Sequence, residues 1–300
     1  MNSMRQFISM IIYALVPLVV LFSAISISCI LAFILIKIVG DVLTFQKMVS
    51  KFTQLLLILS IFPTMKIMGI TKAELGFASR PIFLKQIIQG IILGLLTLTP
   101  MLIALYLLNI NIFDDSKVWT LGLILNKFGL ALLMAILVSL IEEPLFRGVL
   151  LVGLNRKMPT ILAIIVSACY YASLHFLDNN VEIAAKDVHL FTGFELLGGA
   201  VANVFNPTYL SSLYSLIMVG VFLGVIRTKI NASLGICIGC HACWVWQIKT
   251  VKLLFTTNIF SDNIYLVGYY DGIIGHLVTG WLFLEVIKYY FYQHLIKSSD

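Results

Sequence analysis

The sequence has few charged residues. Only 11% of its 300 residues are Asp, Glu, Lys or Arg, whereas 60% are apolar, and the mean hydropathy is +1.03. Ordinary soluble domains are about 25% charged and about 45–50% apolar. The composition therefore excludes a soluble globular domain and a disordered chain. It indicates an all-α, polytopic membrane helix bundle, because several apolar runs reach the roughly 20 residues that cross a bilayer.

Cysteines are also scarce, and each of the five lies inside an apolar run. They are Cys29, Cys169, Cys237, Cys240 and Cys243. This placement excludes a secreted disulfide scaffold and predicts buried thiols. The segment from Cys237 to His241 matches the C-x-x-C-H haem-attachment pattern, but it lies within an apolar span and no cytochrome-like region accompanies it. We therefore favour packing thiols over haem, and over a cysteine–histidine zinc site, because three neighbouring positions on a straight helix close a tetrahedral shell poorly.

Basic residues are not concentrated in any dense tract, although the net charge is +6. Lys and Arg lie instead in short segments between apolar runs, as membrane topology requires. The sequence therefore predicts the lipid bilayer, and not nucleic acid, as the surrounding partner. Basic residues are more frequent on the side of the N-terminus, which favours a cytoplasmic N-terminus. A bacterial plasma membrane is the expected location, and the sequence carries no signal for an oligomeric state.

The apolar runs predict about eight transmembrane helices in a single membrane domain, residues 1–300. We place them at residues 7–39, 52–70, 86–109, 127–152, 159–177, 208–226, 232–255 and 271–293. Two connections differ from short loops. Residues 71–85 look like an interfacial amphipathic stretch. Residues 178–207 form a long, mildly apolar segment, for which a lid, a re-entrant segment and a plain surface loop all stay open.

The segment with the clearest chemistry is SLIEEPLFRGVLL, which contains Glu142, Glu143 and Arg147. Ionisable groups within a membrane span cost roughly 2.5–3.5 kcal/mol each on insertion scales, so they are functional candidates. Glu143 and Arg147 are four residues apart and can pair on one helix face, which leaves Glu142 without a local partner. Pro144 should loosen the helix between them. The alternative is a buried charge network that only fixes helix packing.

Two histidines lie within later apolar runs. Tyr171 and His175 share a helix face in YYASLHF. Helix rise places Glu142 about 22 Å, and His175 about 24 Å, from the connection around Arg156, so these two groups reach a similar depth and could share a water molecule. The same estimate places His241 about 15 Å from the turn at Asn231. His241 is therefore expected several Å shallower than Glu142 and His175.

These three elements resemble the CPBP family, which groups type II CAAX prenyl endopeptidases with bacteriocin-processing and immunity proteins. The segment from Glu142 to Gly148 resembles its first motif, E-E-x-x-x-R. Tyr171 to His175 is similar to its second motif, F-x-x-x-H, with Tyr for Phe. His241 resembles the first residue of its third motif, H-x-x-x-N or H-x-x-x-D, but Val245 occupies the fourth position on. The resemblance covers about residues 120–250, the expected catalytic core.

The resemblance implies an intramembrane endopeptidase in which Glu142 and His175 activate water. Glu143, Arg147 and Tyr171 would support the site, and His241 would face the oxyanion. Val245 cannot donate the hydrogen bond that the family's Asn would supply, and one such donor is worth about 10²–10³ in rate. Trp244 and Gln247 are nearby replacement candidates.

The expected substrate is a hydrophobic or lipid-modified peptide or membrane protein, with CAAX-type prenylated peptides as one class. A catalytically weak or inactive protein of the same fold, acting in bacteriocin immunity or partner binding, is the alternative, because of Val245. A transporter ranks last, since no repeated halves are seen. We expect no cofactor, because Arg147 should occupy Glu143. Zinc held by Glu142, Glu143, His175 and His241 is the competing mechanism.

Overall fold

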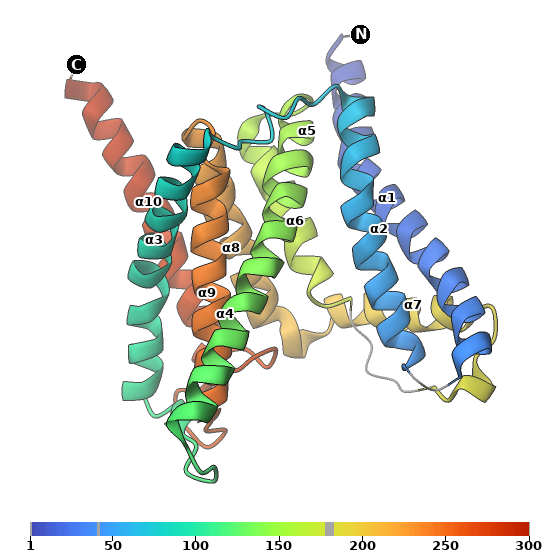
Figure 1. Cartoon of the computed structure of the whole chain (residues 1–300). Helices are drawn as coiled ribbons and strands as arrows, with labels where there is room; N and C mark the ends of the chain where they lie inside the picture. The colour runs from blue at the N-terminus through green and yellow to red at the C-terminus, as the bar shows by residue number, and fades with distance from the viewer. Residues whose placement is uncertain (1, 41–42, 178–182, 300) are drawn as a thin grey trace.

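The computed structural model describes residues 2–40, 43–177 and 183–299 of the chain, which form a helical bundle (Figure 1). Its α-helices are α1 (Asn2–Val39), α2 (Phe45–Met68), α3 (Arg80–Leu107), α4 (Leu121–Glu143), α5 (Leu151–Asn155), α6 (Thr160–Leu174), α7 (Thr192–Val204), α8 (Leu210–Lys229), α9 (Leu234–Leu254) and α10 (His276–Ser299). A π-helix, Pro144–Leu150, joins α4 to α5, and short 3-10 helices occur at Ala185–Asp187, Pro207–Tyr209 and Ile264–Leu266. Strands β1 (Asn111–Phe113) and β2 (Phe255–Thr257) pair antiparallel.

The long apolar helices confirm a multi-pass integral membrane protein. Within the described ranges, five helical segments are long and apolar enough to cross a bilayer. They are Met4–Val39, Phe45–Met68, Arg80–Leu107, Leu121–Asn155 and Pro207–Lys229. Helix α6 is apolar but shorter, and α9 and α10 form helices where the sequence predicts them without being among the five. The predicted number of about eight spans is thus not confirmed.

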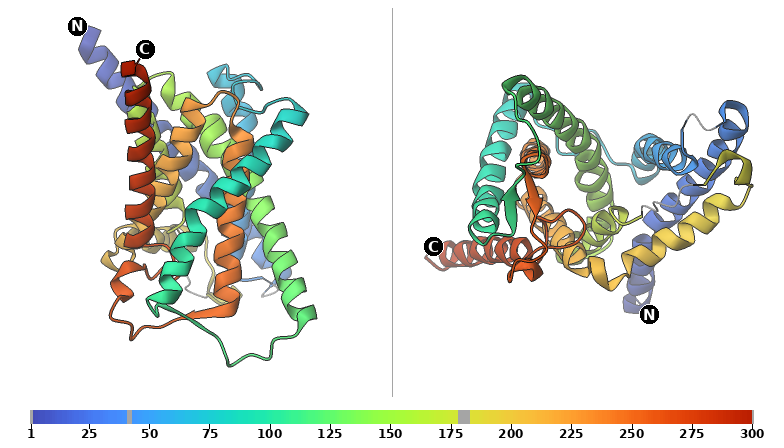
Figure 2. Two further views of the ribbon diagram at one scale, coloured as in Figure 1. Left: turned by 90° about the vertical axis from the view of Figure 1, so that its left-hand side faces the viewer. Right: turned by 90° about the horizontal axis from the view of Figure 1, so that it is seen from below.

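The helices form two groups with a recess between them. Helices α1, α2 and α7 stand to one side of the other helices in both Figure 1 and the view from below in Figure 2. In the larger group α9 is central and packs against α3 and α4. Both ends of the chain lie at the end of the bundle where α5 ends (Figure 1).

Small residues let α9 approach α3 very closely. A Cβ atom added at Gly90 would lie 2.3 Å from the carbonyl oxygen of Ile236, and one at Gly239 would lie 2.2 Å from that of Ile87. Membrane helices associate through such close contacts between backbones, because lipid offers no hydrophobic driving force. The glycine- and cysteine-rich start of α9 is therefore a packing surface.

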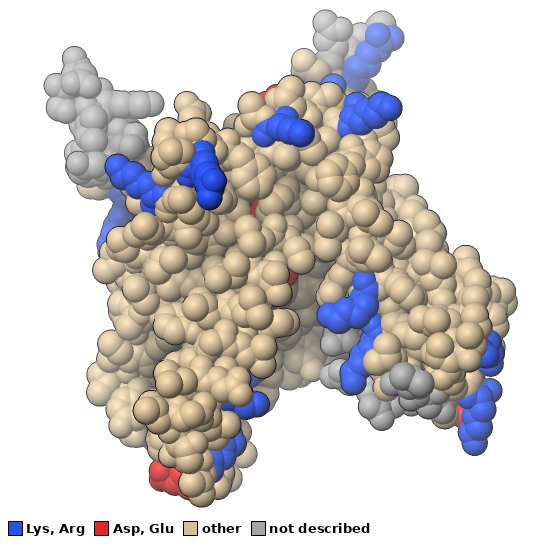
Figure 3. Space-filling view, in the orientation of Figure 1, with Lys and Arg blue, Asp and Glu red and all other residues tan. Residues whose placement is uncertain are grey.

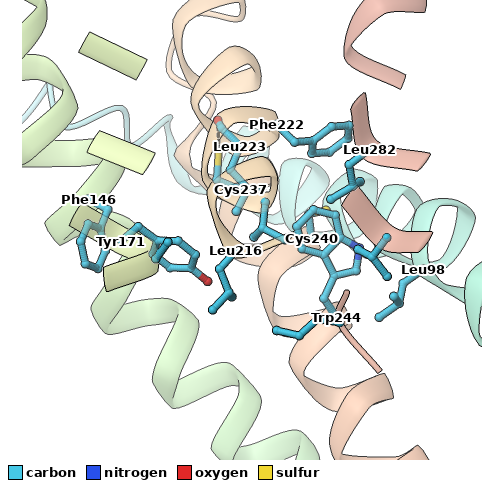
Figure 4. Packing of buried hydrophobic residues seen from close by; sticks show 14 of the residues in the cluster. Leu98, Phe146, Tyr171, Leu216, Phe222, Leu223, Cys237, Cys240, Trp244 and Leu282 are labelled. Carbon is cyan, nitrogen blue, oxygen red and sulfur yellow. Dashed lines mark hydrogen bonds between the residues drawn. The ribbon is translucent and has the colours of Figure 1, made fainter. Parts of the chain in front are cut away.

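The cysteines serve this packing and carry no disulfide within the described residues. Cys237 and Cys240 are fully buried beside Trp244 in the main apolar cluster, which Figure 4 shows together with Phe146 and Tyr171. The prediction of buried thiols holds for four of the five cysteines. It is wrong for Cys169 of α6, which is exposed.

The segment 178–207 contains α7 and the short helix Ala185–Asp187, so it is not a plain loop, while residues 178–182 lie outside the described residues. Helix α7 packs against α1, where a Cβ atom at Gly193 would come within 2.2 Å of the Cys29 sulfur. Residues 71–79 of the predicted amphipathic stretch form turns and an irregular segment, and residues 80–85 are the start of α3. Helix α7 contributes Gly193, Leu196, Leu197 and Ala200 to the wall of a cavity that α2 also lines.

Candidate active site

A π-helix begins at Pro144, directly after the two glutamates. Proline has no backbone N–H to donate, so it breaks the regular helical ladder, and the chain winds wider until Leu150. The N–H of Leu151 then bonds to the carbonyl of Phe146, five residues back. This confirms the loosening predicted at Pro144, and π-helical segments are frequent at functional sites.

Glu143 lies at the centre of a buried charge network. Its Oε1 atom is 3.2 Å from an Arg147 guanidinium nitrogen and 2.7 Å from Nδ1 of His241. The side chains of Glu143 and Arg147 are fully enclosed, with exposed fractions of 0% and 1%. The pairing predicted from their spacing is therefore present. The sequence did not predict the additional contact with His241.

His241 lies between the two glutamates. Its Nδ1 contacts Glu143, and its Nε2 is 3.8 Å from Oε2 of Glu142. Helix rise alone places His241 several Å too shallow, because that estimate ignores the inclination of α4 relative to α9, which is visible in Figure 1. The tertiary packing thus joins the first and third motifs more closely than the sequence predicts.

His175 caps the C-terminus of α6 and does not lie within the helix as the predicted span 159–177 implied. Its Nδ1 is 2.8 Å from the carbonyl oxygen of Tyr171, which fixes the ring orientation. The Tyr171 ring lies 4.7 Å from the His175 ring and 6.1 Å from that of His241, and the Arg147 guanidinium lies over its face at 4.4 Å. Tyr171 therefore joins all three motifs through ring contacts.

Glu142 and His175 line one cavity of about 440 Å³ between α2, α4, α6 and α7. The Glu142 side chain is 26% exposed, and its Oε2 has no hydrogen-bond partner among the described residues. Figure 3 shows the recess between the two helix groups, with a few acidic atoms inside it that are surrounded mainly by uncharged residues. The arrangement places Glu142 on the cavity wall with part of its side chain exposed, while its Oε2 atom is buried close to His241.

A second, larger pocket of about 660 Å³ adjoins this cavity. The two share wall residues from α1, α2, the π-helix and α6: Leu21, Leu57, Leu145, Phe146 and Leu174. All five of these shared residues are aliphatic or aromatic. An apolar chain and a polar peptide group could therefore occupy neighbouring parts of one binding region.

Two predicted replacement donors are engaged elsewhere. The indole Nε1 of Trp244 donates to Thr97 at 2.8 Å, and the Gln247 amide nitrogen donates to the carbonyl of Gly94 at 3.2 Å. Both hydrogen bonds join α9 to α3, and neither involves Glu142 or Glu143. Trp244 and Gln247 are therefore not suited to replace the missing third-motif donor next to Val245.

Tyr270 is a cavity residue that the sequence analysis missed. It comes from the segment after β2, and its ring lies 6.4 Å from His175 and 5.2 Å from Phe176. The next residue, Asp271, accepts the backbone N–H groups of Ile273 and Ile274 at 3.0 and 2.8 Å. Burial raises the pKa of Asp271 above its ordinary value. The only sequence signal was the Asp-Gly dipeptide, which marks a turn.

The geometry does not fit the zinc site kept open as an alternative. Arg147 and His241 hold Glu143, so this carboxylate is committed to a charge network. Within the described part of the chain, no group of three His, Cys, Asp or Glu side chains is arranged to hold a metal ion. We therefore derive no catalytic step through a metal.

The comparison with family models agrees with the motifs. Residues 124–247 match the family described as type II CAAX prenyl endopeptidase Rce1-like, a family of proteases. The match includes Glu142, His175 and His241, and it confirms the resemblance to the CPBP and CAAX protease family that the motifs indicate. No curated protein sequence and no solved structure matches the chain.

Proposed function

We propose that the protein is an intramembrane endopeptidase that hydrolyses a peptide bond in a hydrophobic or lipid-modified peptide, with CAAX-type prenylated peptides as the first class to test. The observation that carries the proposal is that Glu142 and His175 line the same cavity and that the Glu142 side chain is partly exposed. A carboxylate and an imidazole facing one space can orient and deprotonate a water molecule. A bacterial plasma membrane is the proposed location.

In the proposed reaction Glu142 accepts a proton from water while His175 orients that water. The water oxygen bonds to the carbonyl carbon of the substrate and forms a tetrahedral oxyanion. The bond from carbon to nitrogen then breaks, and the proton held by Glu142 passes to the leaving amine. His241, when both ring nitrogens carry protons, donates from Nε2 to the oxyanion, since Nδ1 is held by Glu143.

The test is cleavage of a farnesylated CAAX peptide, and of its unprenylated form, by the purified full-length protein in detergent, read by mass spectrometry. We expect Glu142→Gln to lower kcat about 10²- to 10⁴-fold, the usual contribution of a general base. Glu285→Gln is the matched control, because Glu285 pairs with Lys288 on α10 and not with the cavity. Full activity of Glu142→Ala would overturn the proposal. A chelator is added in a parallel reaction, and we expect no effect of it.

One observation favours a second function, binding without catalysis. Val245 is apolar at the third-motif position, and Trp244 and Gln247 are occupied by bonds to α3. A protein of this fold that holds a peptide partner, as in bacteriocin immunity, needs no oxyanion donor. Saturable binding of the farnesylated peptide by a folded wild type that never cleaves it supports this function over the peptidase.

A further inference from the structure

Helix α2 carries a row of polar side chains that faces the catalytic cavity. Gln46, Ser50, Thr53 and Gln54 recur at helical spacing, and all four line the cavity that holds Glu142 and His175. We call these four residues the polar row. Helix α2 is also the least apolar of the five spans, with a mean hydropathy of 1.4. The row lies outside residues 124–247, so neither the motifs nor the family match accounts for it.

The polar row does not join helices together. Both amide atoms of Gln46 and the hydroxyl of Thr53 are buried, and none has a hydrogen-bond partner among the described residues. Polar residues in membrane helices commonly bond across a helix interface, and these do not. Burying such groups without partners reduces stability. Their presence on a cavity wall is explained if a ligand supplies the partners.

The chemistry of the row matches a peptide main chain. A glutamine carboxamide offers both a donor and an acceptor, and a threonine hydroxyl offers the same, so each can pair with a backbone amide of unspecified sequence. A side-chain cation or phosphate on the ligand would instead require a charged partner in the row, and the row contains none.

The other half of α2 lines the larger pocket with mostly apolar side chains, although Ser60 and Thr64 are among them. Leu57 borders both spaces, and Ile61 and Ile67 belong to the 660 Å³ pocket. One helix therefore presents a polar half next to the carboxylates and a mostly apolar half further along. A peptide lying on α2 would place its main chain at the polar row and its apolar part beyond Leu57.

We propose that Gln46 and Thr53 bind the main chain of the peptide substrate and so position the bond to be cut against Glu142. The inference rests on the proposed function and names the recognition element of that same site. Gln46 and Thr53 are positioning residues. They hold the substrate's extended segment and take no part in proton transfer.

The test measures binding in the inactive Glu142→Gln background, with a fluorescein-labelled farnesylated CAAX peptide as the probe. We expect Gln46→Leu and Thr53→Val each to raise Kd about three- to tenfold, the effect of losing one hydrogen bond. Thr250→Val is the matched control, because Thr250 also has a buried, unpartnered hydroxyl but lines neither cavity. In the otherwise unsubstituted protein, the first two variants should raise KM more than they lower kcat.

A second probe, in which ester bonds replace individual backbone amides of the peptide, identifies the group recognised. The ester that removes the bonded N–H should weaken binding to the parent protein about three- to tenfold, and should weaken binding to Gln46→Leu or Thr53→Val much less.

Melting temperatures should not fall in either variant, since each removes an unpartnered group. Equal Kd values for the variants and their parent, no saturable binding of the probe, or a shift of the same size in Thr250→Val overturns the inference. Because binding is read in an inactive protein, this result is independent of whether the wild type cleaves the peptide.

Discussion

His241 and Glu143 are 98 residues apart in the chain, and Nδ1 of one lies 2.7 Å from Oε1 of the other. Both side chains are buried, and Arg147 contacts the same carboxylate oxygen. The second glutamate of the first motif therefore has a defined task. It neutralises Arg147, and it fixes the ring of His241 so that Nε2 faces Glu142.

This relationship separates the roles of two adjacent glutamates. Glu143→Gln leaves the buried Arg147 without its counter-charge, and breaking a buried ion pair in this way costs about 3–5 kcal/mol. We expect a clearly lower melting temperature in detergent together with loss of activity. Glu142→Gln should lower kcat about 10²- to 10⁴-fold while leaving the free energy of unfolding within about 0.5 kcal/mol of wild type, as for a substitution away from packed features. Equal stability of the two variants contradicts this assignment.

Tyr171 is expected to act through its ring. Its face stacks on the Arg147 guanidinium at 4.4 Å, and its edge contacts His175 and Phe146. Tyr171→Phe keeps these contacts, so kcat should stay within about twofold of wild type, well under 1 kcal/mol. Tyr171→Ala opens a cavity beside the charge network and should cost about 3–5 kcal/mol of stability. Thermal unfolding and peptide cleavage measured on both variants check this. A large loss in Tyr171→Phe would instead assign a role to the hydroxyl.

The site could be predicted from the sequence where a single helix determines it. The spacing of Glu143 and Arg147 predicts their ion pair, and Pro144 predicts the loosened helix. The contact of His241 with Glu143 could not be predicted, because it depends on how α9 inclines against α4. The exposure of Cys169 was missed for a related reason, since in lipid an apolar residue type does not tell which face of a helix is packed.

Two features of the cavity come from segments with little sequence signal. Tyr270 reaches His175 only because the chain after β2 turns back toward α6, and β1 and β2 are too short for a pattern to reveal. The polar row on α2 lowered the apolar character of its span. The helical spacing of these residues places them on one face of α2, but only the structure shows that this face borders the cavity that holds Glu142 and His175.

The connection between α2 and α3 should contribute a stability that depends on pH. Hydrogen bonds from Thr71 and the ion pair with Arg156 lower the pKa of Glu74 from 4.5 to about 2. A lowered pKa means that the stabilisation is complete above the unfolded value and is lost as the pH falls from about 4.5 to about 2. The difference in melting temperature between wild type and Glu74→Gln should therefore be constant from neutral pH to about pH 5 and shrink below it. If the difference in melting temperature between wild type and Glu74→Gln instead grew as the pH falls, it would contradict this prediction.

In the proposed mechanism, Val245 leaves the third-motif position without an oxyanion donor. It follows His241 by one helical turn, so a donor introduced there points to the same side of α9 as the imidazole. Val245→Asn should raise kcat for the farnesylated peptide by about 10-fold or more, since one oxyanion donor is worth up to about 10²–10³ in rate. Val245→Ala is the control for the change in bulk, because it enlarges the space without adding a donor, and it should give no gain.

An equal gain in both variants would show that the valine obstructs the substrate. A loss of activity in Val245→Asn alone would show that the oxyanion is stabilised elsewhere, and Tyr270→Phe would then be the next variant to measure, because Tyr270 lines the cavity beside His175.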